Sequence, residues 1–379
     1  MKLKSLLVSL LAVSALVACN KENDGGAAAP TDGNGISVTV SIKSSGTRAV
    51  ATDFTQETAI TLEYVTVYFT SGENGNIVDT KKFTPEEVAA GKAVFHGINP
   101  SSTHAVVVAN AESLLSPAPT SVSELNNIVL TMANMQDLTA VPLKSNVSQL
   151  VANTGHVAPD DGSEDDVTVD YRKVELTVVP VLSRIEIGGT LKMTAESAGD
   201  VFAYTQFTPE YVGLNGLYEN GKLGGTTDGS LITANDNQLG FPVVGTTPAW
   251  MYNAFDAADQ QDMIAAAGNA VALTKVYAYN VIPGEKPVVM LRFDSKPLPA
   301  NQIPEGIKTA SPAYLKIVNF TDDAKLNKIT IEPGKIYTIE DITFDQDKVT
   351  WLDNTVLCVE AIVHVQDWDI VDLDPEFGE

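Results

Sequence analysis

The sequence is poor in the residues from which most catalytic and metal sites are built. It contains only four histidines and two cysteines among 379 residues. The histidines, His96, His104, His156 and His364, lie far apart and do not show the spacing of a motif such as His-Glu-x-x-His. No Gly-x-Ser-x-Gly elbow is present either. These absences argue against a metalloenzyme or a serine hydrolase, and we expect a protein without enzymatic activity, cofactor or bound metal.

Positive charge is also scarce. The chain carries 24 Lys and Arg residues against 48 Asp and Glu residues, a net charge of −24 at pH 7. A surface that binds nucleic acid needs basic residues to displace counterions from phosphates, so this balance argues against nucleic acid as a partner. Only four arginines occur, Arg48, Arg172, Arg184 and Arg292, and the first lies far from the others.

The chain has two cysteines, Cys19 and Cys358. If Cys19 is lipidated, Cys358 has no other cysteine to pair with, so no disulfide framework can form. Cys358 lies in an apolar, alternating stretch, which is typical of an inert buried thiol rather than a nucleophile. After the N-terminus, no stretch is apolar and long enough to cross a membrane. The core must therefore hold the fold together, and 44% hydrophobic residues over this length suffice.

The N-terminal residues have the pattern of an export signal. Lys2 and Lys4 precede an apolar run over residues 6–17 that ends in Leu-Val-Ala-Cys at Cys19. We therefore predict a lipoprotein signal peptide at residues 1–18, with Cys19 taking lipid and becoming the new N-terminus. The alternative is an ordinary signal peptide with a chance cysteine. A polar Gly/Ala-rich tether follows over residues 20–35.

The next segment alternates strictly, as in a strand with one buried face. Its apolar side chains are Ile36, Val38, Val40 and Ile42. A Ser/Gly stretch then leads to Arg48 and Ala49, which we interpret as a protease site in an exposed, mobile segment. Cleavage there would remove both the lipid and the strand. The alternatives are a strand that stays in place and a surface-loop arginine.

The rest of the chain is typical of a β protein with few short helices. Asn74-Gly75 predicts a hairpin, and capping boxes at Thr84 and Ser121 predict two short helices. Residues 104–110 form an apolar run suited to a strand buried on both faces. Strand material over residues 174–187 is broken by Pro180, where we place a domain boundary.

The second half gives weaker patterns. Residues 257–267 are the best helix candidate, and Asn220-Gly221 predicts a hairpin turn rather than part of a P-loop, because Leu223 stands where Ser or Thr is needed. We expect residues 276–281 to pair with 288–293. The acidic stretch 158–166, whose carboxylates all lie in 160–166, is either a calcium loop or a solvated loop, and its spacing does not match an EF-hand. Residues 357–368 alternate again.

In their order and spacing, these features resemble the fimbrillin (FimA) family, the shaft subunits of type V fimbriae in Bacteroidia. The resemblance rests on the segment around Cys19, the strand at 36–42, the Arg48-Ala49 pair, Pro333-Gly334-Lys335 and the closing strand ending at Trp368. It covers nearly the whole chain. Cys358 departs from the expected pattern, and the acidic tail after Trp368 leaves a tip or accessory role open.

The resemblance implies a mainly β fold with two β-sandwich-like (transthyretin-like) domains, residues 49–180 and 181–379, after a signal peptide (1–18) and a propeptide (19–48). It further implies a lipoprotein precursor in the outer membrane that an arginine-specific protease cuts after Arg48. A donor strand within 355–373 of another copy then fills the groove, giving a cell-surface fimbrium that supports adhesion. The donor residues would be Val359, Ala361, Val363, Val365 and Trp368.

The implied partners are other copies of the chain, fimbrial accessory or anchor subunits, the protease, and host or bacterial surface ligands. Two alternatives stay open. One is an anchor or tip subunit that keeps its lipid. The other is a monomeric surface lipoprotein that binds glycan through exposed aromatic side chains such as Trp250, Tyr252 and Trp351.

Overall fold

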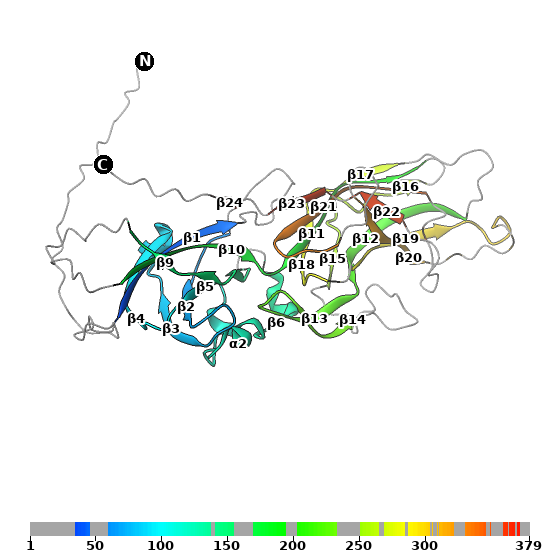
Figure 1. The fold of residues 1–379 in the computed structure, drawn as a ribbon. Helices are drawn as coiled ribbons and strands as arrows, with labels where there is room; N and C mark the ends of the chain where they lie inside the picture. Colours follow the sequence, from blue (N-terminus) through cyan, green and yellow to red (C-terminus); the bar gives the residue numbers. More distant parts are fainter. Residues whose placement is uncertain are drawn as a thin grey trace, which may run out of the picture.

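The computed structural model describes most of the chain between residues 35 and 371. The described residues are 35–45, 60–137, 141–154, 170–194, 203–232, 251–264, 269–284, 287–303, 305, 309, 311–321, 330–345, 349, 359–362, 364–367 and 370–371; for 44–45, 319–321 and everything from 359 onward, only the backbone is described. The fold is mainly β and β-sandwich-like, and it forms two lobes that lie side by side (Figure 1).

The first lobe is built on one ten-stranded sheet with the order β24-β1-β10-β7-β5-β2-β3; β4 pairs with β1, β8 with β5 and β9 with β10. The strands are β1 (Ile36–Ser45), β2 (Thr66–Thr70), β3 (Ile77–Lys82), β4 (Lys92–Ile98), β5 (His104–Ala109), β7 (Leu143–Ser145), β8 (Ser148–Gln149), β9 (Val151–Ala152), β10 (Tyr171–Pro180) and β24 (Ile370–Val371).

The core of the first lobe forms where the strongest apolar runs meet. Ala105, Val106, Val107, Val108 and Ala109 of β5 are all fully buried, as their near-continuous hydrophobicity predicts. Phe95 of β4 contacts Phe69 and Phe83 edge to face, with ring centroids 6.2 and 5.3 Å apart.

The second lobe packs two sheets face to face. One has the order β17-β11-β21-β23 with β18 on β11, and the other β15-β12-β19-β20-β22 with β16 on β12. The strands are β11 (Ser183–Met193), β12 (Tyr204–Asn215), β15 (Tyr252–Ala254), β16 (Met263–Ile264), β17 (Ala270–Ala272), β18 (Tyr277–Val281), β19 (Val288–Pro297), β20 (Ala313–Thr321), β21 (Lys335–Phe344), β22 (Val359–Ile362) and β23 (His364–Asp367). Its separate core includes Ile185, Phe207, Phe293 and Phe344.

The two lobes are joined by a small sheet to which both contribute. In the order β14-β13-β6, strand β6 (Val129–Thr131) comes from the first lobe, and β13 (Leu217–Lys222) and β14 (Thr227–Ile232) come from the second. The short helix η2 (Met132–Gln136) follows β6, and Gln136 exchanges hydrogen bonds with the Asn280 backbone at 3.0 and 3.1 Å. Leu223 and Ile282 pack into the first core. The junction is thus bonded and packed from both sides.

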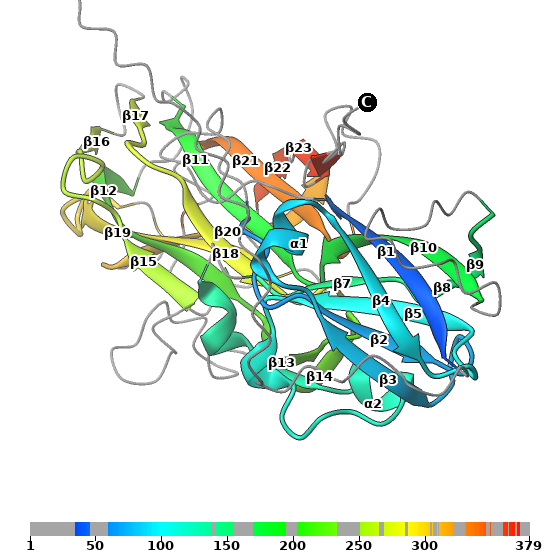
Figure 2. The ribbon, with the colours of Figure 1, turned by 90° about the vertical axis from the view of Figure 1, so that its left-hand side faces the viewer.

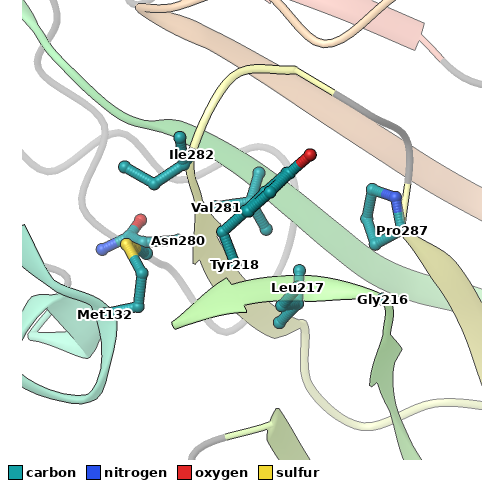
Figure 3. A pocket seen from close by; sticks show the side chains of 8 residues that line it. All are labelled: Met132, Gly216, Leu217, Tyr218, Asn280, Val281, Ile282 and Pro287. Atoms are coloured by element: carbon teal, nitrogen blue, oxygen red, sulfur yellow. The ribbon is translucent and has the colours of Figure 1, made fainter. Parts of the chain in front are cut away.

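A small pocket lies at this junction (Figure 3). It is lined by Met132, Gly216, Leu217, Tyr218, Asn280, Val281, Ile282 and Pro287. The lining is mostly apolar, and the Asn280 amide already donates to the Met135 carbonyl at 2.7 Å. The pocket therefore offers no set of converging free polar groups, and we do not assign a ligand to it.

The two short helices begin where the sequence predicts. α1 (Pro85–Ala89) has the complete capping box, with Thr84 Oγ1 accepting from the Glu87 amide and the Glu87 carboxylate accepting from the Thr84 amide. α2 (Val122–Asn126) keeps only half of it, because the Glu124 carboxylate accepts from Thr120 instead. A short 3-10 helix, η1 (Glu112–Leu114), follows β5. None of the described helices is long enough to cross a membrane.

The helix expected at residues 257–267 is wrong. Residues 257–259 form a turn, and Met263–Ile264 is strand β16. The cause is Asp259, which is fully buried and accepts hydrogen bonds from the Thr274 amide at 2.8 Å and the Tyr277 hydroxyl at 2.9 Å. These distant partners hold the chain in a loop, and local helix propensity does not reflect such contacts.

Two of the predicted hairpins also differ from the structure. Asn220 and Gly221 lie inside β13, and the turn to β14 lies at residues 223–226, where Gly225 has a φ of 80°. Gly221 packs against Ile282, and a Cβ at Gly221 would lie 1.9 Å from Ile282 Cδ1, so that side chain would have to move. Strand β18 pairs with β11 and β19 pairs with β12 and β20, so the expected pairing of 276–281 with 288–293 is wrong.

Candidate assembly site around the first strand

Strand β1 lies between two strands that come from distant parts of the chain (Figure 2). It runs parallel to β10, with Val40 opposite Val174 and Ile42 opposite Leu176. On its other side it runs antiparallel to β4, with Val40 opposite Ala93. Among the described strands, β4 has no partner other than β1. β1 therefore completes the sheet on both sides.

The apolar face of β1 is buried, as its alternation predicts. Ile36, Val38, Val40 and Ile42 are 3%, 0%, 0% and 2% exposed. They belong to the same core cluster as Phe95, Val174 and Leu176. The intervening side chains are more exposed, apart from Ser37 at 4%.

The beginning of β1 is held by close backbone contacts. A Cβ at Gly35 would lie 2.7 Å from the Gly97 Cα, so only glycine fits there without movement. The Ser37 amide donates to the Asp170 carbonyl at 3.0 Å, and the Ser37 hydroxyl lies 2.9 Å from His96 Nδ1. The ladder between β1 and β4 shifts register between Ile36 and Val38, which marks a bulge.

The end of β1 contacts the last described strand. Ser44 and Ser45 pair antiparallel with Val371 and Ile370 of β24, and β24 has no other partner among the described strands. Strand β24 therefore lies beside the strand whose removal the sequence predicts.

The expected donor segment forms two short strands rather than one continuous strand. Val359 and Ala361 lie in β22, which extends the sheet beyond β20, whereas Val365 lies in β23, which pairs with β21 of the facing sheet. Val363 and Trp368 lie outside the described residues. Because the two halves join different sheets, the alternation of 357–368 does not correspond to one strand face.

Other predicted positions lie outside the described residues: Cys19, Arg48, Ala49, the acidic stretch 158–166, Trp250, Trp351 and Cys358. Within the described residues, no group of three or more His, Cys, Asp or Glu side chains is arranged to hold a metal ion. His96 is bonded to Ser37, and His104 Nδ1 lies 2.9 Å from the Thr103 hydroxyl.

The three described arginines are all held in strands. Arg172 of β10 donates to the Ser102 carbonyl at 2.7 Å and twice to the Asp170 carboxylate. Arg184 of β11 is fully buried and lies 3.8 Å from Glu186. Arg292 of β19 lies 2.9 Å from the Glu210 carboxylate, and its side chain is 22% exposed.

The structure also brings together a group of tyrosines that the sequence did not predict. On the outer face of the β12-β19 sheet, Tyr211 packs edge to face against Tyr252, with centroids 6.1 Å apart. The Arg292 guanidinium lies 5.3 Å from the Tyr211 ring centroid. Burial raises the pKa of the neighbouring Tyr314 phenol, and Arg292 partly offsets this. These side chains lie on four strands, β15, β12, β19 and β20, and only the non-local register between the strands places them together.

The chain is similar to a candidate cell adhesion protein of Bacteroides eggerthii, with a TM-score of 0.57, 16% identity, and coverage of 89% of this chain and 97% of that one. It is similar to another from Parabacteroides distasonis, with a TM-score of 0.55, 14% identity, and coverage of 88% and 100%.

The fimbrilin FimA of Porphyromonas gingivalis is also similar, with a TM-score of 0.50, 14% identity, and coverage of 89% of this chain and 99% of that one. No protein-family model and no curated protein matches the sequence. The likeness therefore defines a shared two-lobed β fold over almost nine-tenths of the chain.

Proposed function

We propose that this chain is a structural subunit of cell-surface fimbriae that polymerises by strand exchange after proteolysis and supports adhesion. The observation that carries the proposal is β1 itself, an N-terminal strand with four buried apolar side chains that lies just before the Arg48-Ala49 pair. The fold shared with FimA and with candidate adhesion proteins supports the same role. The precursor would be a lipoprotein anchored through Cys19, with a signal peptide over 1–18 and a propeptide over 19–48.

Removal of β1 would leave a groove that strongly favours a replacement strand. Each of its four Val or Ile side chains contributes roughly 1.5–3 kcal/mol when buried, so about 6–12 kcal/mol in gross terms. β4 would lose its strand partner, and β10 would expose the edge that β1 now covers. Open edges recruit further strands, which makes the empty groove a docking site for an alternating segment.

The arginines support Arg48 as the point of cleavage. A protease needs an extended, accessible segment, and Arg172, Arg184 and Arg292 are each held in a strand by ion pairs, hydrogen bonds or burial. An arginine-specific protease acting on the folded precursor would thus have one preferred site. The mature chain would keep an N-terminal domain (49–180) and a C-terminal domain (181–379).

The donor would be the C-terminal segment of a neighbouring copy, within residues 355–373 and including Val359, Ala361, Val363, Val365 and Trp368. Val359, Ala361 and Val365 lie in strands of the second lobe, whereas the groove lies in the first, so the contact between copies would be head-to-tail and would build a filament. The other partners would be accessory or anchor subunits, the arginine-specific protease, and host or bacterial surface ligands.

Arg48→Ala tests this function. We expect the variant to accumulate as lipid-bearing, unpolymerised precursor, because β1 stays in the groove, whereas Thr47→Ala, which keeps the arginine, assembles normally. The measurement is the N-terminal sequence and the size of the protein in sheared surface material. Fimbriae formed by Arg48→Ala would refute the protease-dependent step.

The tyrosine group favours one alternative, a monomeric lipoprotein that binds glycan at the cell surface. Tyrosine rings beside Arg292 and Glu210 combine stacking surface with charged hydrogen-bonding groups. The test is glycan-array binding by wild type and Tyr252→Ala, with the exposed Tyr64→Ala as control. Binding that only Tyr252→Ala loses would support this alternative; no binding by wild type would exclude it.

A further inference from the structure

We infer that β24 is a strap that holds the end of β1 in the sheet, so that a subunit opens its own groove readily only after it has donated its C-terminal segment. The inference rests on the proposed function, in which β1 leaves after cleavage and a segment within 355–373 enters another copy. β24 lies inside that donor segment and pairs with β1 (Figure 1). The strand that must leave is thus bonded to the segment that must be donated.

The two edges of β1 are covered differently. On one edge, β10 pairs with β1 without interruption as far as Ser44. On the other edge, β4 pairs with β1 only as far as Ser41, and β24 then pairs with Ser44 and Ser45. Within the part of the chain that the structure describes, Ser45 pairs with no strand other than β24. β24 therefore covers the end of an edge that β4 leaves open.

The direction of the backbone amides shows which pair of residues carries the strap. The Ser37 amide donates toward β10, to the Asp170 carbonyl at 3.0 Å, whereas the Ile42 amide donates to the opposite edge, to the Gly91 carbonyl at 2.8 Å. Amides along a strand face its two edges in turn, so the Ser44 amide faces the same edge as that of Ile42. It points toward β24 and away from β10.

β24 lies at the end from which a cut strand would leave. Cleavage after Arg48 would end the β1 fragment three residues beyond Ser45. A strand separates from a sheet most easily at a free end, where the fewest pairs must open first. The opposite end of β1 is held more firmly, because the Ser37 amide donates to Asp170 and the Ser37 hydroxyl lies 2.9 Å from His96 Nδ1. Release would therefore begin at the pairs with β24.

This arrangement couples donation to acceptance. β24 cannot pair with β1 while the segment that contains it occupies the groove of another copy, so donation removes the strap. Coupling of this kind is reciprocal, and β1 in place also favours β24 in place. A cut subunit that has not yet donated keeps its groove closed, which limits recruitment of strands by an open edge. Each subunit would thus donate first and accept second.

Two truncations isolate the effect of β24. A chain that ends at Asp369 lacks β24, whereas a chain that ends at Leu373 keeps it and loses only the residues after it. Hydrogen exchange of the Ser44 amide in the uncut precursor measures the strap without any cleavage. We expect exchange about tenfold faster in the chain that ends at Asp369, because the amide loses its partner, and wild-type exchange in the other. The Val40 amide, which faces β4, should exchange equally in both.

A second measurement follows the release of the strand. Precursor that lacks the signal peptide and carries Cys358→Ser is labelled with a dye on Cys19 and cut after Arg48, and fluorescence anisotropy after dilution reports loss of the fragment. We expect release about tenfold faster from the chain that ends at Asp369 than from the chain that ends at Leu373.

A single substitution in the full chain gives an independent test. Ser44→Pro removes the amide that faces β24 and leaves the pairing amides that face β10, so we expect it to accelerate release as the loss of β24 does. Ser44→Ala is the matched control, because it keeps the amide and should release the fragment at the wild-type rate.

Equal exchange of the Ser44 amide in the two truncated chains, or equal release of the fragment, would overturn the inference. If the fragment leaves at the expected rates but the cut chain forms no filaments, the proposed function fails and the strap stands. Filaments from cut chains that release the fragment equally with and without β24 would support the proposed function and refute the strap. If the protease does not cut at Arg48, the proteolytic step fails, and hydrogen exchange alone decides the strap.

Discussion

Val40 lies in the middle of β1, and its side chain is fully buried between Ala93 and Val174. Val40→Ala removes two methyl groups and leaves a cavity, so we expect it to lower the free energy of unfolding of the first lobe by about 2 kcal/mol. The neighbouring Thr39 points to the other face, and Thr39→Ala should cost less than about 0.5 kcal/mol. Urea unfolding of the uncut precursor measures both. Equal losses would mean that the two faces of β1 do not differ in burial energy.

The buried phenol of Tyr68 in β2 should make the stability of the first lobe depend on pH under alkaline conditions. Burial raises the pKa of its phenol from 10.0 to about 12. Between these values the unfolded chain loses the proton while the folded chain keeps it, so the folded state binds more protons and stability falls as pH rises. The contribution is complete below pH 10 and is lost through pH 12. Tyr68→Phe should therefore show a shallower loss of stability over this range, measured by urea unfolding at each pH. Parallel curves for the two proteins would contradict this.

At the scale of secondary-structure elements, strand pairing limits which arginines a protease can reach. Arg172, Arg184 and Arg292 lie within β10, β11 and β19, whose ladders must open before the backbone can enter an active site. We expect an arginine-specific protease to cut the folded precursor once, at Arg48, and to cut Arg48→Ala only after denaturation. Mass spectrometry of the fragments checks this. An early cut at Arg172 would show that β10 opens first.

Elements whose causes are local were predictable. The Thr84 capping box, the Asn74-Gly75 hairpin and the buried strand β5 each depend on a few neighbouring residues. The failed helix at 257–267 depends instead on Asp259 reaching Thr274 and Tyr277, and the partners of β18 and β19 depend on sheet topology. These contacts join distant parts of the sequence, so no local pattern contains them.

The candidate site shows the same division. The burial of Ile36, Val38, Val40 and Ile42 follows from alternation and was predictable. That β4 and β10 flank them, and that Gly35 crosses Gly97, follows only from the assembled sheet. The alternation of 357–368 predicted a single strand, and the structure contains two. A regular pattern is compatible with one strand or with two, and here β22 and β23 join the two facing sheets of the second lobe.

For the whole molecule, the junction determines whether the two lobes behave as one body. β6 adds a strand of the first lobe to β13, and Leu223 and Ile282 of the later sequence pack into the first core. A filament joined end to end by strands would transmit tension through this junction in every subunit. We therefore expect the lobes of the wild-type protein to unfold in one thermal transition.

Asn280 is the residue at which this coupling can be broken. Its side chain is fully buried, donates to the Met135 carbonyl at 2.7 Å and accepts from Arg184 Nε at 3.3 Å. Asn280→Ala leaves the Met135 carbonyl without this donor, so we expect a loss of about 1–3 kcal/mol and two resolved transitions in calorimetry. Gln260→Ala is the matched control, because its amide donates at 2.7 Å to the Phe255 carbonyl within the second lobe. If both variants keep a single transition at a similar temperature, the packing of Leu223 and Ile282 is sufficient to couple the lobes. If Gln260→Ala also separates them, the hydrogen bonds at Asn280 have no special role.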